Sequence, residues 1–200
     1  MEIRKAKITD DFSQITTLIY NTDKYIYPYM FFNTKNWKEI LIDMIKTKGT
    51  LFYYDNILLA VENEKIAGIV IFFNQNTYFS KDYSKWQNID KNIDFTIKNY
   101  ILPTISHKLY NSIYISNVCV NSEFRGQGIS KKLLNHLFET YKDTNFELDV
   151  LSDNSIAINL YKSFNFTITG EIKGFNARYK RKPKVFNMKR NFLQKLNKNT

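Results

Sequence analysis

The chain has 200 residues and a formal net charge of +10, with 44% hydrophobic and 16% aromatic residues. This composition excludes a disordered chain, and the length suits one substantial hydrophobic core. A single cysteine excludes an intramolecular disulfide, and no apolar run is long enough to span a bilayer. We therefore expect a single domain over residues 1–200 of a cytoplasmic protein, without a signal peptide because the first residues are charged.

The first part of the chain alternates predicted strands and helices. A strand is predicted over 2–8, with Ile3 and Ala6 or Ile8 facing inward, and Thr9 or Asp10 is expected to cap the helix that follows. The apolar positions of this helix are Phe12, Ile15, Leu18 and Ile19. A second helix is predicted over 33–46, with Trp37, Ile40, Leu41, Met44 and Ile45 on its apolar side.

A predicted hairpin comes next, with strands at 57–61 and 65–73. Residues 75–111 form a long aromatic insertion, in which we expect a helix around 95–109. The composition is rich in Ile, Asn, Lys, Tyr and Phe, which indicates an AT-rich and bacterial genome.

A glycine-rich turn stands out in the second half of the chain. The apolar residues 118–120 lead into a polar turn, in which Gly126 and Gly128 lie one residue apart. A helical pattern follows at once through Ile129, Leu133, Leu134, Leu137 and Phe138. A turn that opens a helix directs backbone N–H groups and the positive end of the helix dipole outward, so it can bind an anion, usually a phosphate. Arg125 adds a cation, although glycine also serves turns that bind nothing.

A second strand and a short helix follow this turn. Residues 146–151 place Phe146, Leu148 and Val150 on one face of a strand, and Glu147 and Asp149 on the other. Asp, Asn or Ser at 153–155 can cap the helix, which ends at Asn165, a residue type that tolerates a left-handed helix end. A last strand is predicted through Val185, Phe186, Met188 and Phe192, after a loop at 177–183.

The order strand, Arg-Gly-Gln-Gly-Ile-Ser, helix, strand and Asn-x-x-Ala-x-x-Leu-Tyr-Lys resembles the GNAT superfamily of N-acetyltransferases over residues 113–166. Two positions depart from the family pattern: Ser130 stands where Gly or Ala is usual, and Asn165 stands where Gly is usual. The resemblance implies an α/β (α+β) fold, with a mixed central sheet of about seven strands flanked by helices. It places the insertion between the third and fourth strands.

The resemblance also implies a function: transfer of the acetyl group of acetyl-CoA to a primary amine of a small molecule or peptide, by direct attack in a ternary complex. The backbone of Val118, Cys119 and Val120 would pair with the pantetheine amides, and an N–H there could stabilise an oxyanion. The pyrophosphate would lie on the turn formed by Arg125, Gly126, Gln127, Gly128, Ile129 and Ser130. Asn154 would hydrogen-bond the pantetheine arm.

Two residues are implied in catalysis. Tyr161 matches the family tyrosine that protonates the departing thiolate, although a tyrosine on a short helix can equally be a packing residue. Asp149 is a candidate general base, with a solvated side chain and a water relay as the alternatives. Cys119 is expected to be a core residue rather than a nucleophile. His107 and His136 lack metal-ligand spacing, so we expect no metal.

The sequence leaves open the identity of the acceptor and the role of the basic C-terminal end. The resemblance implies an acceptor wall of Tyr25, Tyr27, Tyr29, Phe31 and Phe32 with the basic loop 178–184, whose charge argues against polycations and for a carboxylate or phosphate group. Residues 173–200 hold ten of the 29 Lys and Arg and no acid, which leaves 19 bases and 19 acids in residues 1–172. This tract could attract phosphates or be a solvated tail.

Three functions are therefore weighed: the acetyltransferase, a non-catalytic acyl-CoA-binding regulatory module, and a nucleic-acid-associated protein that uses the basic C-terminus. An amine acceptor is the expected partner, with no membrane. The sequence leaves open whether the protein forms a homodimer.

Overall fold

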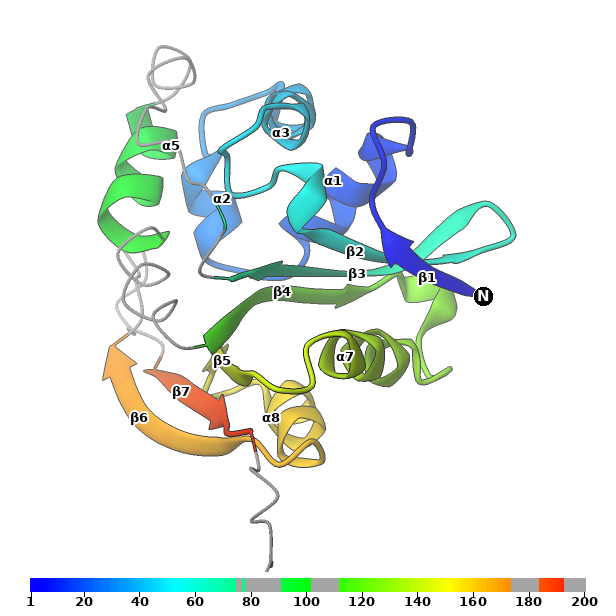
Figure 1. The fold of residues 1–200 in the computed structure, drawn as a ribbon. Helices are drawn as coiled ribbons and strands as arrows, with labels where there is room; N and C mark the ends of the chain where they lie inside the picture. Colours follow the sequence, from blue (N-terminus) through cyan, green and yellow to red (C-terminus); the bar gives the residue numbers. More distant parts are fainter. Residues whose placement is uncertain (75–76, 78–90, 102–111, 174–183, 193–200) are drawn as a thin grey trace, which may run out of the picture.

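A seven-stranded sheet forms the centre of the computed structural model, which describes residues 1–74, 77, 91–101, 112–173 and 184–192 (Figure 1). The strands lie in the order β1-β2-β3-β4-β5-β7-β6. Only β4 and β5 are parallel neighbours among these described strands. Their bounds are Glu2–Lys5 (β1), Ile57–Glu62 (β2), Lys65–Phe73 (β3), Ser112–Val120 (β4), Asn145–Leu151 (β5), Thr167–Lys173 (β6) and Lys184–Arg190 (β7). The mixed sheet and the α+β class are confirmed.

Helices cover both faces of the sheet (Figure 1). One face carries α1 (Phe12–Tyr20), α2 (Ile26–Met30), α3 (Trp37–Lys46) and α5 (Lys91–Thr96), and the other carries α7 (Ile129–Thr140) and α8 (Ser155–Lys162). Three single turns complete the described elements: Tyr54–Asn56 (η1), Ile97–Ile101 (η2) and Ser122–Phe124 (η3). Each face therefore buries its own core, which we call the α1-side core and the α7-side core.

The cap of α1 differs from the prediction. Asp11, and not Thr9 or Asp10, accepts the backbone N–H groups of Ser13 and Gln14 at 2.9 and 3.3 Å. The carboxylate of Asp10 is instead held by both guanidinium nitrogens of Arg4, at 2.8 and 2.6 Å, and this hydrogen bonding lowers the pKa of Asp10. Because Arg4 on β1 binds the carboxylate of Asp10, Asp11 caps the helix instead.

Three other predicted elements were wrong at their ends. β1 stops at Lys5 rather than at residue 8. Of the two residues expected to face inward beyond it, Ala6 is buried and Ile8 is 54% exposed. The second long helix begins at Trp37 rather than at residue 33, and the short α2 precedes it. β7 ends at Arg190, which leaves Phe192 outside the strand and exposed.

The hairpin of β2 and β3 and the apolar stripes of α1, α3 and α7 are confirmed. The predicted helix in the insertion begins earlier, as α5 and η2, and residues 102–111 lie outside the described residues. The loop at 177–183 lies outside them as well.

The end of α8 has the left-handed residue that the sequence predicted. Asn165 has φ of 65°, and the N–H groups of Asn165 and Phe166 donate to the carbonyls of Lys162 and Tyr161 at 3.0 and 3.2 Å. This pair of bonds is a Schellman motif. The ring of Phe166 packs against Tyr161 with centroids 5.8 Å apart. The motif therefore anchors the backbone and the ring of Tyr161 together.

Asn165→Val should lower the free energy of unfolding by about 1–2 kcal/mol, because a β-branched residue is strained in the left-handed region. Urea denaturation measures this. Asn159→Val is the matched control, since Asn159 is exposed within α8 and the two residue types have similar helix propensity. Equal losses in both variants would contradict the assignment.

Candidate functional site

A fork opens in the middle of the sheet between β4 and β5. The two strands pair only from Ser112–Ile115 against Asn145–Leu148. Beyond this point β4 continues along β3 to Val120, while β5 continues along β7 to Leu151. The three residues of β4 beside the fork, Val118, Cys119 and Val120, are only half-buried although their strand is central. A gap therefore lies where a neighbouring strand would normally be.

The backbone of β4 presents polar groups to this fork. Asn121 donates its N–H to the carbonyl of Ala67 at 2.9 Å, and the register pairs Cys119 with Ile69. Residues that face a neighbouring antiparallel strand alternate along the chain, so the N–H and C=O groups of Val118 and Val120 point away from β3. An extended ligand with amide groups can pair with them as a strand would.

A turn for an anion follows at the end of β4. Gly126 and Gly128 have φ of 79° and 71°, and Gly128 begins α7 without a side-chain cap from any described residue. A Cβ built on either glycine meets nothing within 4 Å among the described residues, so the space outside the turn is open. The N–H groups of the first turn of α7 face that space with the helix dipole behind them. The predicted phosphate turn thus has suitable geometry for an anion.

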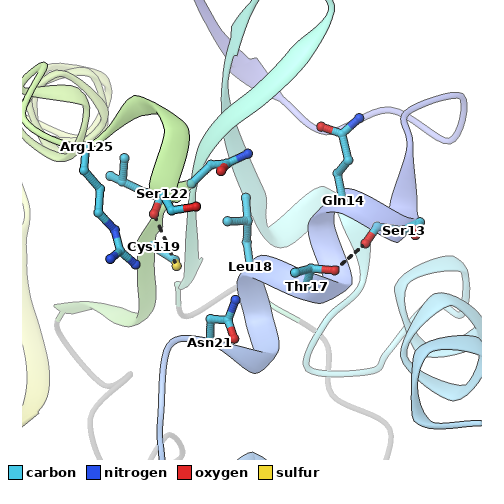
Figure 2. Close-up of a pocket in the computed structure, with 10 residues that line it drawn as sticks. Ser13, Gln14, Thr17, Leu18, Asn21, Cys119, Ser122 and Arg125 are labelled. Carbon is cyan, nitrogen blue, oxygen red and sulfur yellow. Dashed lines mark hydrogen bonds between the residues drawn. The ribbon is translucent and has the colours of Figure 1, made fainter.

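A cavity of about 230 Å³ adjoins this turn. Figure 2 shows α1 on one side of it and the end of β4 with Arg125 on the other. The lining residues are Ser13, Gln14, Thr17, Leu18, Asn21, Cys119, Val120, Asn121, Ser122 and Arg125. Arg125 is exposed, and its guanidinium has no ion pair within the described part of the chain. The cavity offers hydroxyl and amide groups from α1 and a cation from the turn.

Cys119 lies in the wall of this cavity and packs against the α1-side core. Burial raises the pKa of its thiol, while the charge of Arg125 opposes that shift. A thiol with a raised pKa is a poor nucleophile at neutral pH. Cys119 therefore packs against the core, as the sequence predicted, while part of its side chain lines the cavity.

Tyr161 lies on α8 and is 8% exposed. Burial raises the pKa of its phenol well above the ordinary value of 10. The phenol is therefore protonated at neutral pH and can act only as a proton donor there. The side chain also packs in the α7-side core, which is the packing role that the sequence offered as the alternative to catalysis.

Asn154 caps α8. Its Oδ1 accepts the N–H of Ala157 at 3.1 Å, while its side-chain nitrogen has no hydrogen-bond partner among the described residues. One end of the amide is thus used by the helix, and the other end can donate to a ligand at the fork.

Asn154→Asp should separate these two roles, because aspartate keeps the capping oxygen but loses the donor. We expect acetyl-CoA, the coenzyme that the family resemblance implies, to bind about 10-fold more weakly, the effect of one lost hydrogen bond, with little change in stability. Isothermal titration calorimetry measures the affinity. Asn159→Asp, on the exposed side of the same helix, controls for the added charge; identical affinities in both variants would leave Asn154 as a cap alone.

Asp149 is held by two donors. The side-chain amide of Asn187 on β7 donates to Oδ1 at 2.6 Å, and the phenol of Tyr114 on β4 donates to Oδ2 at 3.2 Å. The pKa of the Tyr114 phenol is raised, chiefly by burial and next by the charge of Asp149. The phenols of Tyr27 and Tyr161 make smaller contributions in the same direction. Asp149 is therefore not merely solvated, because its carboxylate accepts from both donors.

Asn117 is a buried polar residue at the fork, where the β3–β4 register shifts. Its Nδ2 donates to the hydroxyls of Thr22 and Tyr27 at 2.6 and 2.8 Å, which ties β4 to the segment after α1 and to α2. Its Oδ1 is buried and has no partner in the described part of the protein.

Sequence reasoning missed Tyr114, Asn117 and Asn187. The only local signal was strand alternation, which assigns a face but no partner.

The expected aromatic wall divides in two. Tyr27 and Phe31 are buried in the α1-side core, and burial raises the pKa of the Tyr27 phenol. Tyr25 and Tyr29 are half-buried, and Phe32 is exposed. Tyr27 thus acts as a packing residue, whereas the basic loop 178–184 falls largely outside the described residues.

No helix in the described ranges is long and apolar enough to cross a membrane.

Comparison with known proteins gives one family. The model of the Acetyltransferase (GNAT) family matches residues 18–166. The chain is 31% identical over 64 residues to spermine/spermidine N(1)-acetyltransferase of Bacillus subtilis, a match that covers 30% of this chain and 42% of that protein. It is 33% identical over 69 residues to thialysine N-epsilon-acetyltransferase of Sus scrofa, covering 33% of this chain and 41% of that one. Each match thus spans less than half of the relative.

Solved structures share the whole fold. An N-acetyltransferase from Staphylococcus aureus Mu50 aligns with a TM-score of 0.69 at 23% identity, covering 94% of this chain and 100% of that one. The protein yncA of Salmonella typhimurium, solved with its cofactor acetyl-CoA, aligns with a TM-score of 0.57 at 17% identity over 97% and 95% of the two chains. These similarities concern the fold.

Proposed function

The chain belongs to the GNAT acetyltransferase family of acyltransferases, and from this premise we propose that it transfers the acetyl group of acetyl-CoA to a primary amine. The acceptor is a small molecule or a peptide, and attack takes place in a ternary complex. The observation that carries the proposal is the fork in the sheet, because it leads directly into the glycine turn. One extended ligand that has amides and a pyrophosphate suits both features.

The coenzyme is held by three groups of residues in this proposal. The pyrophosphate lies against the N–H groups of residues 125–130, with the Arg125 guanidinium as counter-charge. The pantetheine amides pair with the backbone of Val118 and Val120. The side-chain nitrogen of Asn154 donates to the same arm from the opposite side of the fork.

The reaction needs three proton transfers. Asp149 accepts a proton from the ammonium form of the acceptor, so an N–H bond breaks and an O–H bond forms on its carboxylate. The neutral amine nitrogen then bonds to the acetyl carbon, and the C–S bond breaks as its electron pair leaves on sulfur. Tyr161 gives its phenolic proton to that thiolate, and its phenolate takes up the second proton that the acetylated nitrogen loses. A backbone N–H of β4 stabilises the charge on the acetyl oxygen during attack.

The class of amine is left open by the relatives, since their names specify a polyamine in one case and thialysine in the other. Both are amines with more than one cationic group. A panel that includes polyamines, amino acids and peptide N-termini therefore covers the acceptor classes under consideration.

Calorimetry and thermal unfolding with acetyl-CoA and with ADP test the coenzyme site. At a hundred times its Kd, acetyl-CoA should stabilise the protein by about 2.7 kcal/mol, and ADP should bind more weakly. Release of free thiol across the amine panel then tests transfer. Binding without transfer to any amine would support a regulatory acyl-CoA-binding module. No stabilisation at millimolar acetyl-CoA would refute the coenzyme site, and salt-dependent RNA binding would favour the nucleic-acid alternative.

A further inference from the structure

A row of four residues crosses the C-terminal half of the sheet on one face. Tyr114 lies on β4, Asp149 on β5, Asn187 on β7 and Gly170 on β6, and these strands are successive neighbours. The registers pair Asp149 with Asn187 and Asn187 with Gly170. The row lies opposite Phe146, Leu148 and Val150, which belong to the α7-side core.

Gly170 leaves room in this row for the Asn187 amide. A Cβ built on Gly170 would lie 3.0 Å from Oδ1 of Asn187, which is tighter than nine in ten such contacts, so the amide would have to shift by a few tenths of an ångström. The backbone of Gly170 does not have a positive φ, so its conformation alone would admit other residues. The β6–β7 register also shifts just before Gly170, which places the glycine beside the Asn187 amide. The missing side chain leaves room for that amide beside β6.

The Asn187 amide in turn orients Asp149. Its Nδ2 donates to Oδ1 of the carboxylate at 2.6 Å from the β7 side. With Oδ1 held there, Oδ2 is directed to the β4 side, where the Tyr114 phenol donates to it at 3.2 Å. Leu148 is the last residue of β5 that pairs with β4, so Asp149 stands where the two strands separate, and Oδ2 is its oxygen on the β4 side. A carboxylate oxygen can accept more than one donor and so can keep Tyr114 while it meets an amine.

We propose that Asn187 is a positioning residue for the acetyl transfer: with the space left by Gly170, it fixes the Asp149 carboxylate so that Oδ2 faces the acceptor amine at the fork. The inference rests on the proposed function for its catalytic meaning. The geometry of the row stands independently of it. Asn187 and Gly170 act through Asp149.

Coupled substitutions test the row through turnover. Gly170→Ala should lower kcat by about 10-fold, since it displaces the Asn187 amide by a few tenths of an ångström and a misplacement of about 1 Å can cost about 100-fold. The Kd for acetyl-CoA should be unchanged. Asn187→Ala should have a similar effect. In the Asn187→Ala background, Gly170→Ala should cause no further loss, because the amide that it displaces is gone. In the Asp149→Asn background, neither substitution should matter.

Additive losses in kcat, or losses that persist in the Asp149→Asn background, would overturn the proposal. A uniform rise in KM for acetyl-CoA would also overturn it, because a general loss of structure predicts that result. The Gly170→Ala, Asn187→Ala double variant controls for misfolding. Truncation of Asn187 removes its contact with the new Cβ at position 170, while the amide stays absent.

A second measurement does not depend on activity. The side-chain NH₂ resonances of Asn187 in ¹H–¹⁵N spectra should be shifted and slow to exchange in the wild-type protein, and both features should disappear in Gly170→Ala and Asp149→Asn. If no amine in the panel is acetylated, the proposed function fails, and these spectra still decide the geometry of the row. Unchanged resonances in Gly170→Ala would refute the row itself.

Discussion

Gly128→Trp should weaken the binding of acetyl-CoA by at least about 100-fold while the protein remains folded. The indole would fill the space in front of the first turn of α7, where the N–H groups face outward. Folding should survive because a Cβ on Gly128 meets no described atom within 4 Å. The positive φ of 71° adds strain of about 1–2 kcal/mol, a loss that most domains tolerate. Isothermal titration calorimetry gives the Kd, and circular dichroism checks the fold.

Gly49→Ala is the matched control for backbone strain. Gly49 has φ of 89° and follows α3, on a segment that does not line the fork or the cavity. Its substitution should lower stability and leave the Kd for acetyl-CoA unchanged. An unaltered Kd in Gly128→Trp would show that the anion does not bind at this turn.

Tyr161→Phe should lower kcat by about 100-fold or more with little change in the Kd for acetyl-CoA. The substitution removes the proton donor for the thiolate, and general acid catalysis typically contributes 10²- to 10⁴-fold. The ring and its contact with Phe166 remain, so the fold should be kept. Steady-state kinetics with the best amine of the panel, together with calorimetry, separate the two effects.

The pH profile of the wild-type protein provides a second check on Tyr161. Burial raises the pKa of this phenol above its ordinary value of 10. A group that acts as an acid works below its pKa and fails above it, so loss of activity caused by its ionisation should occur only above pH 10. Tyr141→Phe is the matched control, because Tyr141 also packs in the α7-side core and burial also raises its pKa. Equal kcat values in the two variants would remove Tyr161 from the mechanism.

Local signals predicted the elements on the α7 side of the fork. The apolar spacing of α7 and the alternation of β5 both depend on residues within one turn or one strand, so they are visible in the sequence. Asn165 was predicted as a left-handed helix end for the same reason, since the preference belongs to the residue and its neighbours. The glycine turn is equally local.

The ends of elements and the partners of polar groups were harder to predict. Asp10 and Asp11 are equivalent as caps in the sequence, and the choice depends on Arg4 of another element. Helix α3 began four residues later than predicted, because the apolar period does not define where the first turn forms. Asn117 is joined to residues 90 and 95 positions away, which no local pattern can indicate.

The sequence by itself determined the glycine turn, the residues around it and the helix that carries Tyr161, because backbone conformation and apolar periodicity depend on near neighbours. The tertiary structure alone decided where β4 leaves β5, which donors hold Asp149 and why β6 has a glycine opposite Asn187. Those features arise from strand register between segments that are far apart in the chain. Register is set by the packing of the whole sheet, so it exists only once the fold is formed.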